Sequence, residues 1–506
     1  MKFTRLVLGL PLSLLLFASI SQAQEAAKVG AFEITFDAEI FGAQTASAFQ
    51  GEVFIAFSED KEPRHAVHAW FNAPPVMRFD MSEVEPGSVV TVSTGDAIAM
   101  HPLDLAGAEP QIFKVQAIAR LSRTGRQAGL SSGDVYSKVQ EISFVPSSQG
   151  VVSLVLNQVA EERAFEETER IRVFEFVSPA LSEFHGFEYT MKAGVLLPNN
   201  YDESMTYPVL YSVTGFGGDH RSIGRWQRGL EGSPLDQCII VVPDANNRYG
   251  HSVFCDSDSI GPWGQALVHE MIPALEEEFH GAGAEQRYVT GISSGGWSSL
   301  WLQVAYPDQF SGCWSHVPDP IDFHDFQQIN LYEPLADGSP RNMFVDESGE
   351  KRPLARRDGK VMLHYVDFVE RENVLNPGGQ IRSFEGTFSP LLPDGTPRRV
   401  FDVESGEIDH EAAKAWKKYD ISNTLLTGWD ELRPNLKGKI HVYAGEIDTF
   451  YLEGAVERFQ KLAGEAGMLD DMVIEVIPDM THSQHRPGFQ DMVDTIGERA
   501  TSGTGE

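Results

Sequence analysis

The sequence is short of cysteine, of positive charge and of long apolar runs. Only three of its 506 residues are cysteines, so a framework of disulfides does not hold the fold together. Lysine and arginine total 40 against 73 aspartates and glutamates, which gives a formal net charge of -33. A surface so acidic repels nucleic acid and anionic membranes. After the N-terminal segment, no apolar stretch is long enough to span a bilayer.

The three cysteines are Cys238, Cys255 and Cys313. Cys238 lies in an apolar run, which is typical of a buried thiol. A single bridge between Cys238 and Cys255 is compatible with an oxidising compartment, and the sequence does not decide whether it forms.

Residues 1–23 have the composition of a secretory signal peptide. Lys2 and Arg5 supply the positive charge, and residues 6–20 form an apolar core. Ser21-Gln22-Ala23 offers the small residues of a cleavage site. The apolar core is short for a spanning helix. We therefore expect a secreted or periplasmic protein with no membrane span after cleavage.

Residues 24–170 read as an all-β, sandwich-like domain. Short apolar segments alternate with clusters of Gly, Pro, Ser and Asp, and no long helical period appears. Strands are expected at residues 32–36, 51–57, 89–92, 113–118, 139–145 and 151–156. Trp70 and Phe71 fit a core role better than a binding face. The charged segment 160–168 is expected to connect this domain to the next.

Residues 171–506 alternate strand and helix patterns, which predicts a doubly wound α/β domain with a parallel sheet. Strands are expected at residues 193–197, 209–213, 239–242, 288–292, 312–316, 440–443 and 473–477. Helices are expected at residues 263–279, 294–306, 452–466 and 489–497. The alternation breaks down in residues 318–436, which we interpret as an insertion that forms a lid or substrate wall. The alternative is an insertion far from the site.

The segment Arg287–Tyr306 has the pattern of a nucleophile elbow. An apolar strand turns sharply through Gly291-Ile292-Ser293-Ser294-Gly295 and continues as a helix, with the motif G-x-S-x-G at the turn. A side chain at Gly291 or Gly295 would collide with the neighbouring strand or helix. The helix N-terminus directs backbone N–H groups at the oxyanion that forms when Ser293 attacks a carbonyl.

The same motif occurs at Gly129-Leu130-Ser131-Ser132-Gly133, where its surroundings differ. No apolar strand precedes this second copy, and no small-faced helix follows it. A motif counts only in its structural context. We therefore predict a surface loop at residues 129–133 and a catalytic serine at Ser293.

A serine nucleophile needs a base and an orienting acid, in the chain order serine, acid, histidine. Asp448 and His482 each follow an apolar strand, so both should lie at the same sheet edge as Ser293. We assign Ser293 as nucleophile, His482 as base and Asp448 as orienter. Glu446 and His485 are the alternatives for the acid and the base. The tetrapeptide Gly406–Asp409 repeats G-E-I-D within the insertion and is expected to form a turn.

The oxyanion hole needs two converging backbone donors. One is the N–H of Ser294, and the other should come from the glycine-rich loop 214–218. Phe216 N–H is the first choice and Gly217 N–H the second. The spacing matches neither a dinucleotide fingerprint nor a Walker lysine motif, so a phosphate cradle is not favoured. Residues 256–258 resemble a calcium loop only faintly, and we expect no metal and no cofactor.

These features together resemble the putative esterase family of α/β-hydrolases, which includes esterase D, feruloyl esterases, enterochelin esterases and mycolyltransferases. The residues that carry the resemblance are Tyr207-Pro208-Val209-Leu210-Tyr211, Gly215-Phe216-Gly217-Gly218, Gly291–Gly296, Gly445–Asp448 and His482. The resemblance spans about residues 177–496 and implies the fold, the triad and both oxyanion donors. Thr214 stands where many relatives have histidine, and Ser294 where methionine is common. The long insertion leaves the substrate open.

The sequence thus predicts a secreted serine hydrolase that cleaves small-molecule or carbohydrate-linked carboxylic esters through an acyl-enzyme. An acyltransferase on the same fold is the alternative within enzymes, and a peptidase is less favoured. A carbohydrate- or ligand-binding protein with a silent site is the alternative outside enzymes. The sequence does not indicate an oligomeric state.

Overall fold

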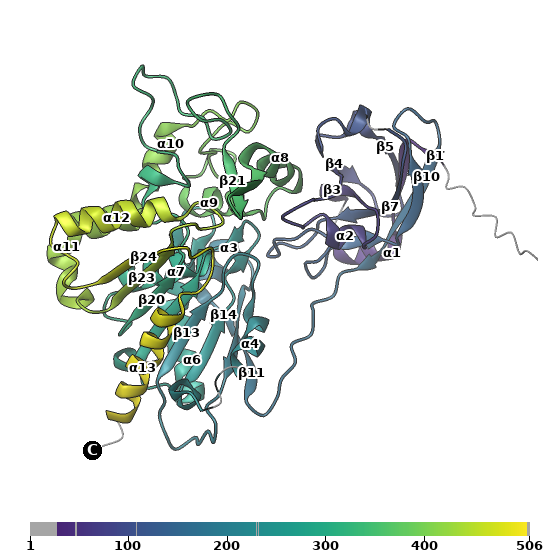
Figure 1. Cartoon of the computed structure of the whole chain (residues 1–506). Coiled ribbons are helices and arrows are strands. Elements are labelled where there is room, and N and C mark those ends of the chain that lie inside the picture. The colour runs from purple at the N-terminus through teal and green to yellow at the C-terminus, as the bar shows by residue number, and fades with distance from the viewer. Residues whose placement is uncertain (1–27, 46–47, 108, 229, 231, 503–506) are drawn as a thin grey trace, which may run out of the picture.

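The computed structural model describes residues 28–502 except 46, 47, 108, 229 and 231. The expected signal peptide, residues 1–23, lies outside the described residues. An N-terminal ten-stranded sheet and a second, eight-stranded sheet are joined by an extended connector, and a helical lobe lies above the second sheet (Figure 1). No helix in the described ranges is both long and apolar enough to cross a membrane.

Residues 28–159 form one ten-stranded sheet with a phenylalanine-rich core. Its strands are β1 (Lys28–Val29), β2 (Ala31–Phe36), β3 (Phe49–Ser58), β4 (Val76–Val84), β5 (Val89–Ser93), β6 (Ala99–His101), β7 (Gln111–Ala119), β8 (Val135–Ser137), β9 (Gln140–Phe144) and β10 (Val151–Val159). All six expected strands overlap these elements. Strands β1, β4, β6 and β8 and two short helices, α1 (Ala38–Gln44) and α2 (Pro63–Ala66), were not expected.

The second sheet has eight strands in the order β11-β12-β14-β13-β19-β20-β23-β24. They are β11 (Ile171–Val177), β12 (Thr190–Leu196), β13 (Val209–Val213), β14 (Ile239–Pro243), β19 (Arg287–Ile292), β20 (Cys313–His316), β23 (Ile440–Gly445) and β24 (Val473–Ile477). Strands β14, β13, β19, β20, β23 and β24 run parallel, and β12 is antiparallel to its neighbours. The seven expected strands are confirmed, and β11 is additional.

Helices cover both faces of this sheet, which gives the α/β-hydrolase architecture. Apolar side chains pack one face against α3 (Pro179–His185), α6 (Ile272–Phe279), α7 (Ser294–Ala305), α11 (Ile421–Leu436) and α12 (Glu453–Glu465). The other face packs against α4 (Ile223–Gln227) and α13 (Arg486–Ser502). The single helix expected at residues 263–279 is α5 (Trp263–Gln265), a π-helical segment (Ala266–Met271) and α6 in succession.

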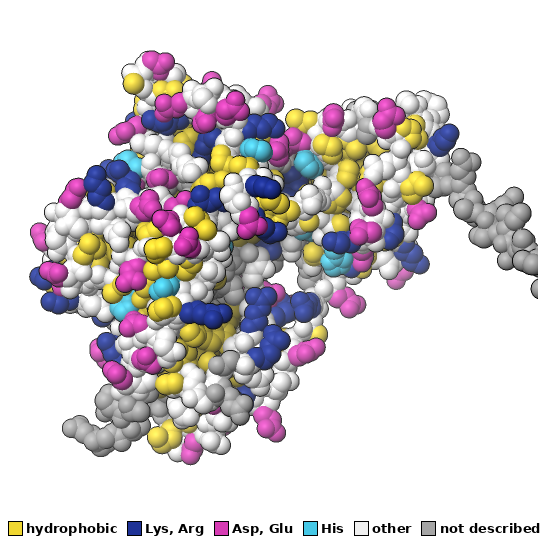
Figure 2. Space-filling view, viewed as in Figure 1, with side chains coloured by type: hydrophobic (Ala, Val, Ile, Leu, Met, Phe, Trp, Pro, Cys, Tyr) yellow, Lys and Arg dark blue, Asp and Glu magenta, His cyan; other side chains and the backbone are white. Residues whose placement is uncertain are grey.

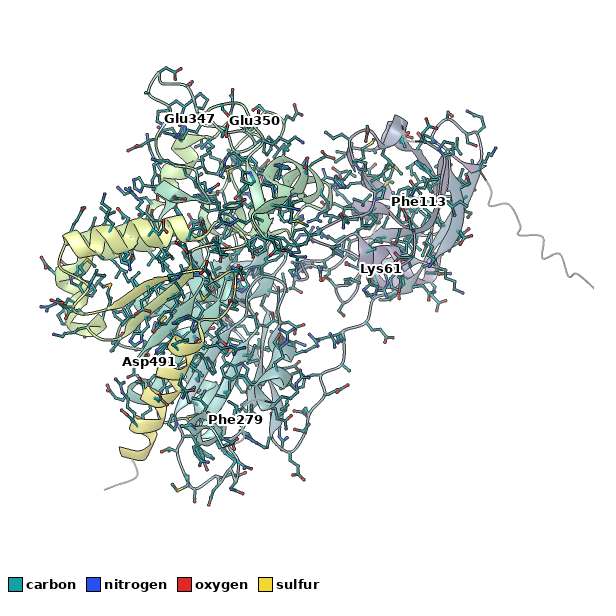
Figure 3. All side chains as sticks on the ribbon, in the orientation of Figure 1. Lys61, Phe113, Phe279, Glu347, Glu350 and Asp491 are labelled. Carbon is teal, nitrogen blue, oxygen red and sulfur yellow. The ribbon has the colours of Figure 1, made fainter. Side chains whose placement is uncertain are left out.

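Most of the expected insertion 318–436 folds above the carboxyl ends of the strands and has its own elements, whereas its last helix, α11, packs on the face of the sheet. The elements above the strands are the hairpin β21 (Pro353–Arg357) and β22 (Lys360–His364), and the helices α8 (Tyr365–Leu375), α9 (Gln380–Phe388) and α10 (His410–Ala415). Phe388 and Trp416 lie in one aromatic cluster with Trp297 of α7, which attaches the lobe to the sheet. Glu347 and Glu350 mark its outer end, and Phe113 marks the N-terminal sheet (Figure 3).

The N-terminal sheet docks onto this insertion through buried polar contacts. The Arg120 guanidinium donates to the carbonyls of Asn376 and Pro377, at 3.0 and 3.1 Å. It also pairs with Glu52 of its own sheet at 3.1 Å. His101 contacts Glu370 of α8 at 2.9 Å. Such contacts place residues of the N-terminal sheet region close to the edge where the site is expected.

All three cysteines are buried free thiols. Cys238 and Cys255 are therefore not bridged in this structure. Burial raises the pKa of the Cys238 thiol to about 12, which keeps it protonated and unreactive at neutral pH.

Candidate active site

Ser293 lies at the sharp turn between β19 and α7. Its backbone has φ 60° and ψ −127°, a strained conformation for a residue with a side chain. A Cβ at Gly295 would lie 2.0 Å from the carbonyl oxygen of Val213, and one at Gly291 would lie 2.1 Å from that of Gly295. Only glycine fits at either position, as the elbow pattern predicts.

The second copy of the motif has none of these features. Residues 129–133 form turns before β8 and belong to neither a strand nor a helix. The Ser131 hydroxyl donates to the Gln127 carbonyl at 2.8 Å, which is a local turn contact. The predicted loop is confirmed, and only the copy at Ser293 lies between a strand and a helix.

Asp448 and His482 form a hydrogen-bonded pair at the same edge of the sheet. His482 Nδ1 lies 2.7 Å from Asp448 Oδ2. The other carboxylate oxygen accepts the backbone N–H of Phe450 at 2.7 Å, and the Asp448 side chain is fully buried. The imidazole is thus held in one orientation, with Nε2 free to exchange a proton with a serine.

Both alternative residues lie elsewhere. Glu446 is exposed, and its carboxylate accepts the backbone N–H of Asp479 at 3.2 Å. The His485 ring stacks on Tyr443 with the centroids 5.0 Å apart. Neither residue contacts the other, so they do not form an acid–histidine pair.

Ser293 and His482 line one cavity of about 370 Å³. Ser293 Oγ makes no hydrogen bond to any residue that the structure describes. Serine–histidine contacts of hydrolases are often long without substrate and shorten when it binds. The structure therefore brings all three predicted residues to one site, with the acid–base half already joined.

The loop Thr214–Gly218, which follows β13, lies against this cavity. Gly215 and Phe216 are among its lining residues, and Gly217 has φ 89°. The Phe216 N–H donates to no acceptor within the described chain. Ser294 is the first residue of α7, where backbone N–H groups have no intrahelical acceptor. Neither predicted oxyanion donor therefore has a backbone acceptor among the described residues.

A buried polar cluster beside the elbow could not be foreseen from the sequence. The Ser294 hydroxyl donates to Asp319 Oδ2 at 2.6 Å, and the Gln380 amide lies 3.2 Å from each partner. Burial raises the pKa of Asp319 to about 6, while the hydrogen bond from Ser294 and the charge of His482 act in the opposite direction. Asp319 comes after β20 and Gln380 from α9, so only the tertiary fold unites them.

Aromatic side chains from three parts of the chain form the rest of the cavity wall. Trp70 and Phe71 come from the N-terminal sheet region, Phe384 from the insertion, and Phe450 from the loop after Asp448. The Phe450 ring meets His482 edge to face, with the centroids 4.9 Å apart. Trp70 also packs on the main hydrophobic core. It therefore has both the expected core role and a place in the cavity wall.

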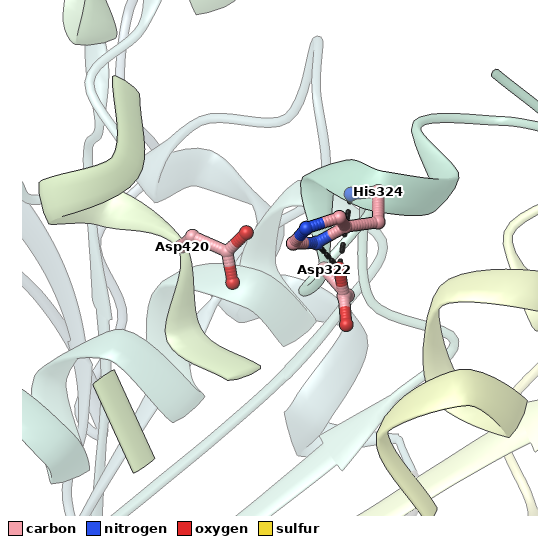
Figure 4. A group of neighbouring side chains, drawn as sticks. All are labelled: Asp322, His324 and Asp420. Atoms are coloured by element: carbon pink, nitrogen blue, oxygen red, sulfur yellow. Dashed lines mark hydrogen bonds and ion pairs between the residues drawn. The ribbon is translucent and has the colours of Figure 1, made fainter. Parts of the chain in front are cut away.

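One group of side chains in the described residues has the spacing of metal ligands, namely Asp322, His324 and Asp420. His324 bonds Asp322 directly, and Asp420 faces them across the group (Figure 4). All four carboxylate oxygens accept from protein donors: His324, Ser422, Arg458, Phe323, Tyr332 and Asn423. With its oxygens already occupied, the cluster fits a structural role that fixes the insertion to the sheet.

Several solved structures of esterases are similar to this chain at low identity. A ferulic acid esterase is 12% identical with a TM-score of 0.39, and the match covers 66% of this chain and 99% of that one. An S-formylglutathione hydrolase from Agrobacterium tumefaciens is 15% identical with a TM-score of 0.38, covering 65% and 95%. A ferulic acid esterase from Anaeromyces mucronatus is 14% identical with a TM-score of 0.33, covering 66% and 93%. Similarity at this level carries no functional argument.

A search of curated proteins gives no significant match. A family model described as "Putative esterase" matches residues 185–491, which is more than half of the chain. The match includes the elbow, the glycine-rich loop, the insertion, Asp448 and His482. The chain therefore belongs to the putative esterase family.

Proposed function

We propose that this protein is a serine hydrolase that cleaves carboxylic esters through an acyl-enzyme on Ser293. The observation that carries the proposal is the 2.7 Å contact between His482 and Asp448, with His482 lining the same cavity as the strained Ser293. A buried carboxylate that orients a histidine beside a serine is the arrangement that activates a hydroxyl at neutral pH.

In the proposed reaction, His482 Nε2 takes the proton of the Ser293 hydroxyl as its oxygen attacks the ester carbonyl. The oxyanion of the tetrahedral intermediate is held by the N–H groups of Phe216 and Ser294. The C–O bond to the alcohol then breaks, and His482 returns the proton to the leaving oxygen. Water, deprotonated by His482, attacks the acyl-enzyme, and the carboxylic acid leaves as Ser293 regains its proton.

The cavity at Ser293 favours an ester with a compact apolar or aromatic part. Its wall is rich in aromatic side chains, and its volume of about 370 Å³ is at the small end of ligand pockets. Small-molecule and carbohydrate-linked esters both remain within the proposal. The family match and the composition of the pocket support this class of substrate, and neither identifies one compound.

The proposal extends to the organisation of the chain. Residues 1–23 are a signal peptide, residues 24–170 a β-sandwich-like domain, and residues 171–506 the catalytic domain, whose insertion 318–436 serves as a lid or wall. The mature enzyme is then secreted or periplasmic. The insertion helices α8 and α9 support the wall function, because both contribute residues to the cavity lining.

Two matched variants test the function. Ser293→Ala should abolish both the hydrolysis of 4-nitrophenyl acetate and labelling by a fluorophosphonate, with an unchanged circular dichroism spectrum. Ser131→Ala, in the second copy of the motif, should keep both. Undiminished turnover in Ser293→Ala would refute the assignment. Competition of an added alcohol with water for the acyl group would instead identify an acyltransferase.

A further inference from the structure

A second, larger cavity adjoins the pocket of Ser293, and the proposed chemistry does not use it. Its volume is about 720 Å³. The residues shared by both cavities are Trp70, Gly215, Phe216, Ile292 and Phe368. The two cavities therefore adjoin at the loop that carries the proposed oxyanion donor, and a ligand that occupied both would pass this loop.

The larger cavity is rich in positive charge although the chain has a formal net charge of -33. Arg126, Arg225 and Arg371 line it, and Glu372 is the one carboxylate among the described lining residues. Glu372 already accepts backbone N–H groups at the start of α9. The space-filling view shows Lys and Arg side chains gathered over the region of α4, which carries Arg225 (Figure 2). In so acidic a protein, a local concentration of cations at a cavity indicates an anionic ligand.

Arg126 is the most unusual of these cations. Its guanidinium lies 4.7 Å from the centroid of the Phe216 ring, and it forms no hydrogen bond or ion pair with the described residues. Burial lowers its pKa to about 10, so the group is still charged at neutral pH. A half-buried cation without a paired acid is partly desolvated, and an anionic ligand would offset that cost.

The carboxylates whose charges act on the pKa of Arg126 are Asp219 and Asp244, and they raise it. Both carboxylates accept hydrogen bonds from other residues. Asp219 accepts from the backbone N–H and the guanidinium of Arg221. Asp244 accepts from His220 Nδ1 at 2.8 Å and from Asn246. The two carboxylates partly offset the positive charge of Arg126, but they accept no hydrogen bond from its guanidinium.

A second unpartnered group lines the same cavity. The buried Thr214 hydroxyl, at the start of the glycine-rich loop, has no hydrogen-bond partner in the described chain. Buried hydroxyls are nearly always bonded, so an unsatisfied hydroxyl that lines the same cavity as a free guanidinium points to a polar ligand in that cavity. A carboxylate or phosphate oxygen accepts from both kinds of donor.

We propose that the larger cavity binds an anionic oxygen group of the ester substrate, a carboxylate or a phosphate, with the half-buried Arg126 as its cation. Arg225 adds charge at the exposed rim. Arg126 belongs to the N-terminal sheet region, so that region takes part in substrate selection. This inference rests on the proposed function and narrows its substrate class to esters that carry a negative charge away from the scissile bond.

The carboxylate arm of the test compares two series of 4-nitrophenyl esters on the full chain. One series has monocarboxylic acyl groups, and the other has dicarboxylic acyl groups of the same lengths with a free terminal carboxylate. We expect the wild type to prefer the charged ester at one or more lengths in kcat/KM. Arg126→Gln should lower the charged-to-neutral ratio about 10- to 100-fold, the range for loss of a charge-assisted hydrogen bond. Arg126→Lys should retain part of it.

Arg123→Gln is the matched control, because it removes the same charge three residues away. The Arg123 guanidinium lies over the Phe187 ring at 3.8 Å and does not line the cavity. This variant should keep the wild-type ratio. The phosphate arm measures inhibition of 4-nitrophenyl butyrate hydrolysis by phenyl phosphate, and Arg126→Gln should weaken that inhibition at least tenfold.

Equal kcat/KM for charged and neutral esters, together with unchanged phenyl phosphate inhibition in Arg126→Gln, would overturn the inference and leave the hydrolase intact. A ratio that falls equally in Arg123→Gln would also overturn it, because the effect would then come from net charge. Failure of Ser293 to react with a fluorophosphonate would overturn the proposed function itself. The two failures are thus distinguishable.

Discussion

The Trp70 indole lies 5.5 Å from the Phe450 ring, centroid to centroid, and Phe450 in turn meets the ring of His482. Trp70 comes from the N-terminal sheet region, and Phe450 from the loop that carries Asp448. Through these two rings the N-terminal region reaches the proposed base. It therefore contributes to the active-site pocket and is more than an appended module.

This contact predicts an effect of Trp70→Ala on large substrates. Removing the indole opens one wall of the pocket and forfeits an aromatic contact of about 1 kcal/mol or more. We expect kcat/KM for 4-nitrophenyl esters of aromatic acids to fall about tenfold. Trp70→Phe should retain most of the rate, and 4-nitrophenyl acetate should be affected less than the aromatic esters. An equal loss for all substrates would contradict a role in the wall.

The pairing of His482 with Asp448 predicts a severe effect of Asp448→Asn. An amide cannot stabilise the imidazolium and favours the wrong tautomer, so kcat should fall about 10³- to 10⁴-fold with little change in KM. The exposed neighbour Glu446→Gln is the matched control and should keep wild-type kcat. Steady-state kinetics with 4-nitrophenyl butyrate measures both. A larger loss of kcat in Glu446→Gln than in Asp448→Asn would identify Glu446, and not Asp448, as the acid that orients His482.

The sheet strands near the site were predictable because their signals are local. Strands β13 and β24 have the predicted bounds, Val209–Val213 and Val473–Ile477, since both are short apolar runs between turn-forming residues. The elbow was predictable because the backbone geometry at Ser293 demands glycine on both sides. Hydrophobic pattern and steric exclusion act within one segment and need no knowledge of the rest of the fold.

The insertion and the polar cluster were not predictable in this way. Helices α8 and α9 lie in a stretch rich in Pro, Gly and charge, and they bury polar side chains such as Glu372 and Gln380 that read as solvent-exposed. Tertiary packing therefore overrides the local pattern there. The juxtaposition of Asp319 with Ser294, and of Arg126 with Phe216, depends on where distant segments dock. No sequence period encodes those contacts.

Gly295→Ala should disrupt the elbow. The added Cβ would lie 2.0 Å from the Val213 carbonyl oxygen, so β13 or α7 must move. We expect a loss of several kcal/mol in unfolding free energy, or failure to fold, as for severe overpacking. Gly224→Ala in α4 is the control, because no atom lies within 4 Å of its added Cβ. That change should be neutral or stabilise by about 0.5–1 kcal/mol. Thermal unfolding of both variants measures the difference.

The buried carboxyl of Asp319 predicts a stability difference that depends on pH. Its pKa is about 6 in the folded state against an ordinary value of 3.8, so the folded state binds this proton more tightly than the unfolded state. The contribution of Asp319 to stability is therefore fully present below about pH 4 and is lost as the pH rises through 6. Asp319→Asn is nearly isosteric, keeps an acceptor for Ser294, and does not titrate.

The stability of Asp319→Asn relative to the wild type should thus increase between pH 4 and 6 and level off above, by about 3 kcal/mol in all. Thermal unfolding midpoints across this range measure it. Asp322→Asn is a control of opposite sign, because the hydrogen bond from His324 and other partners lower the pKa of Asp322 despite its burial. That variant should lose stability at neutral pH and approach the wild type in acid. If the stability difference between Asp319→Asn and the wild type did not change with pH, the pKa of the Asp319 carboxyl would not be raised by burial.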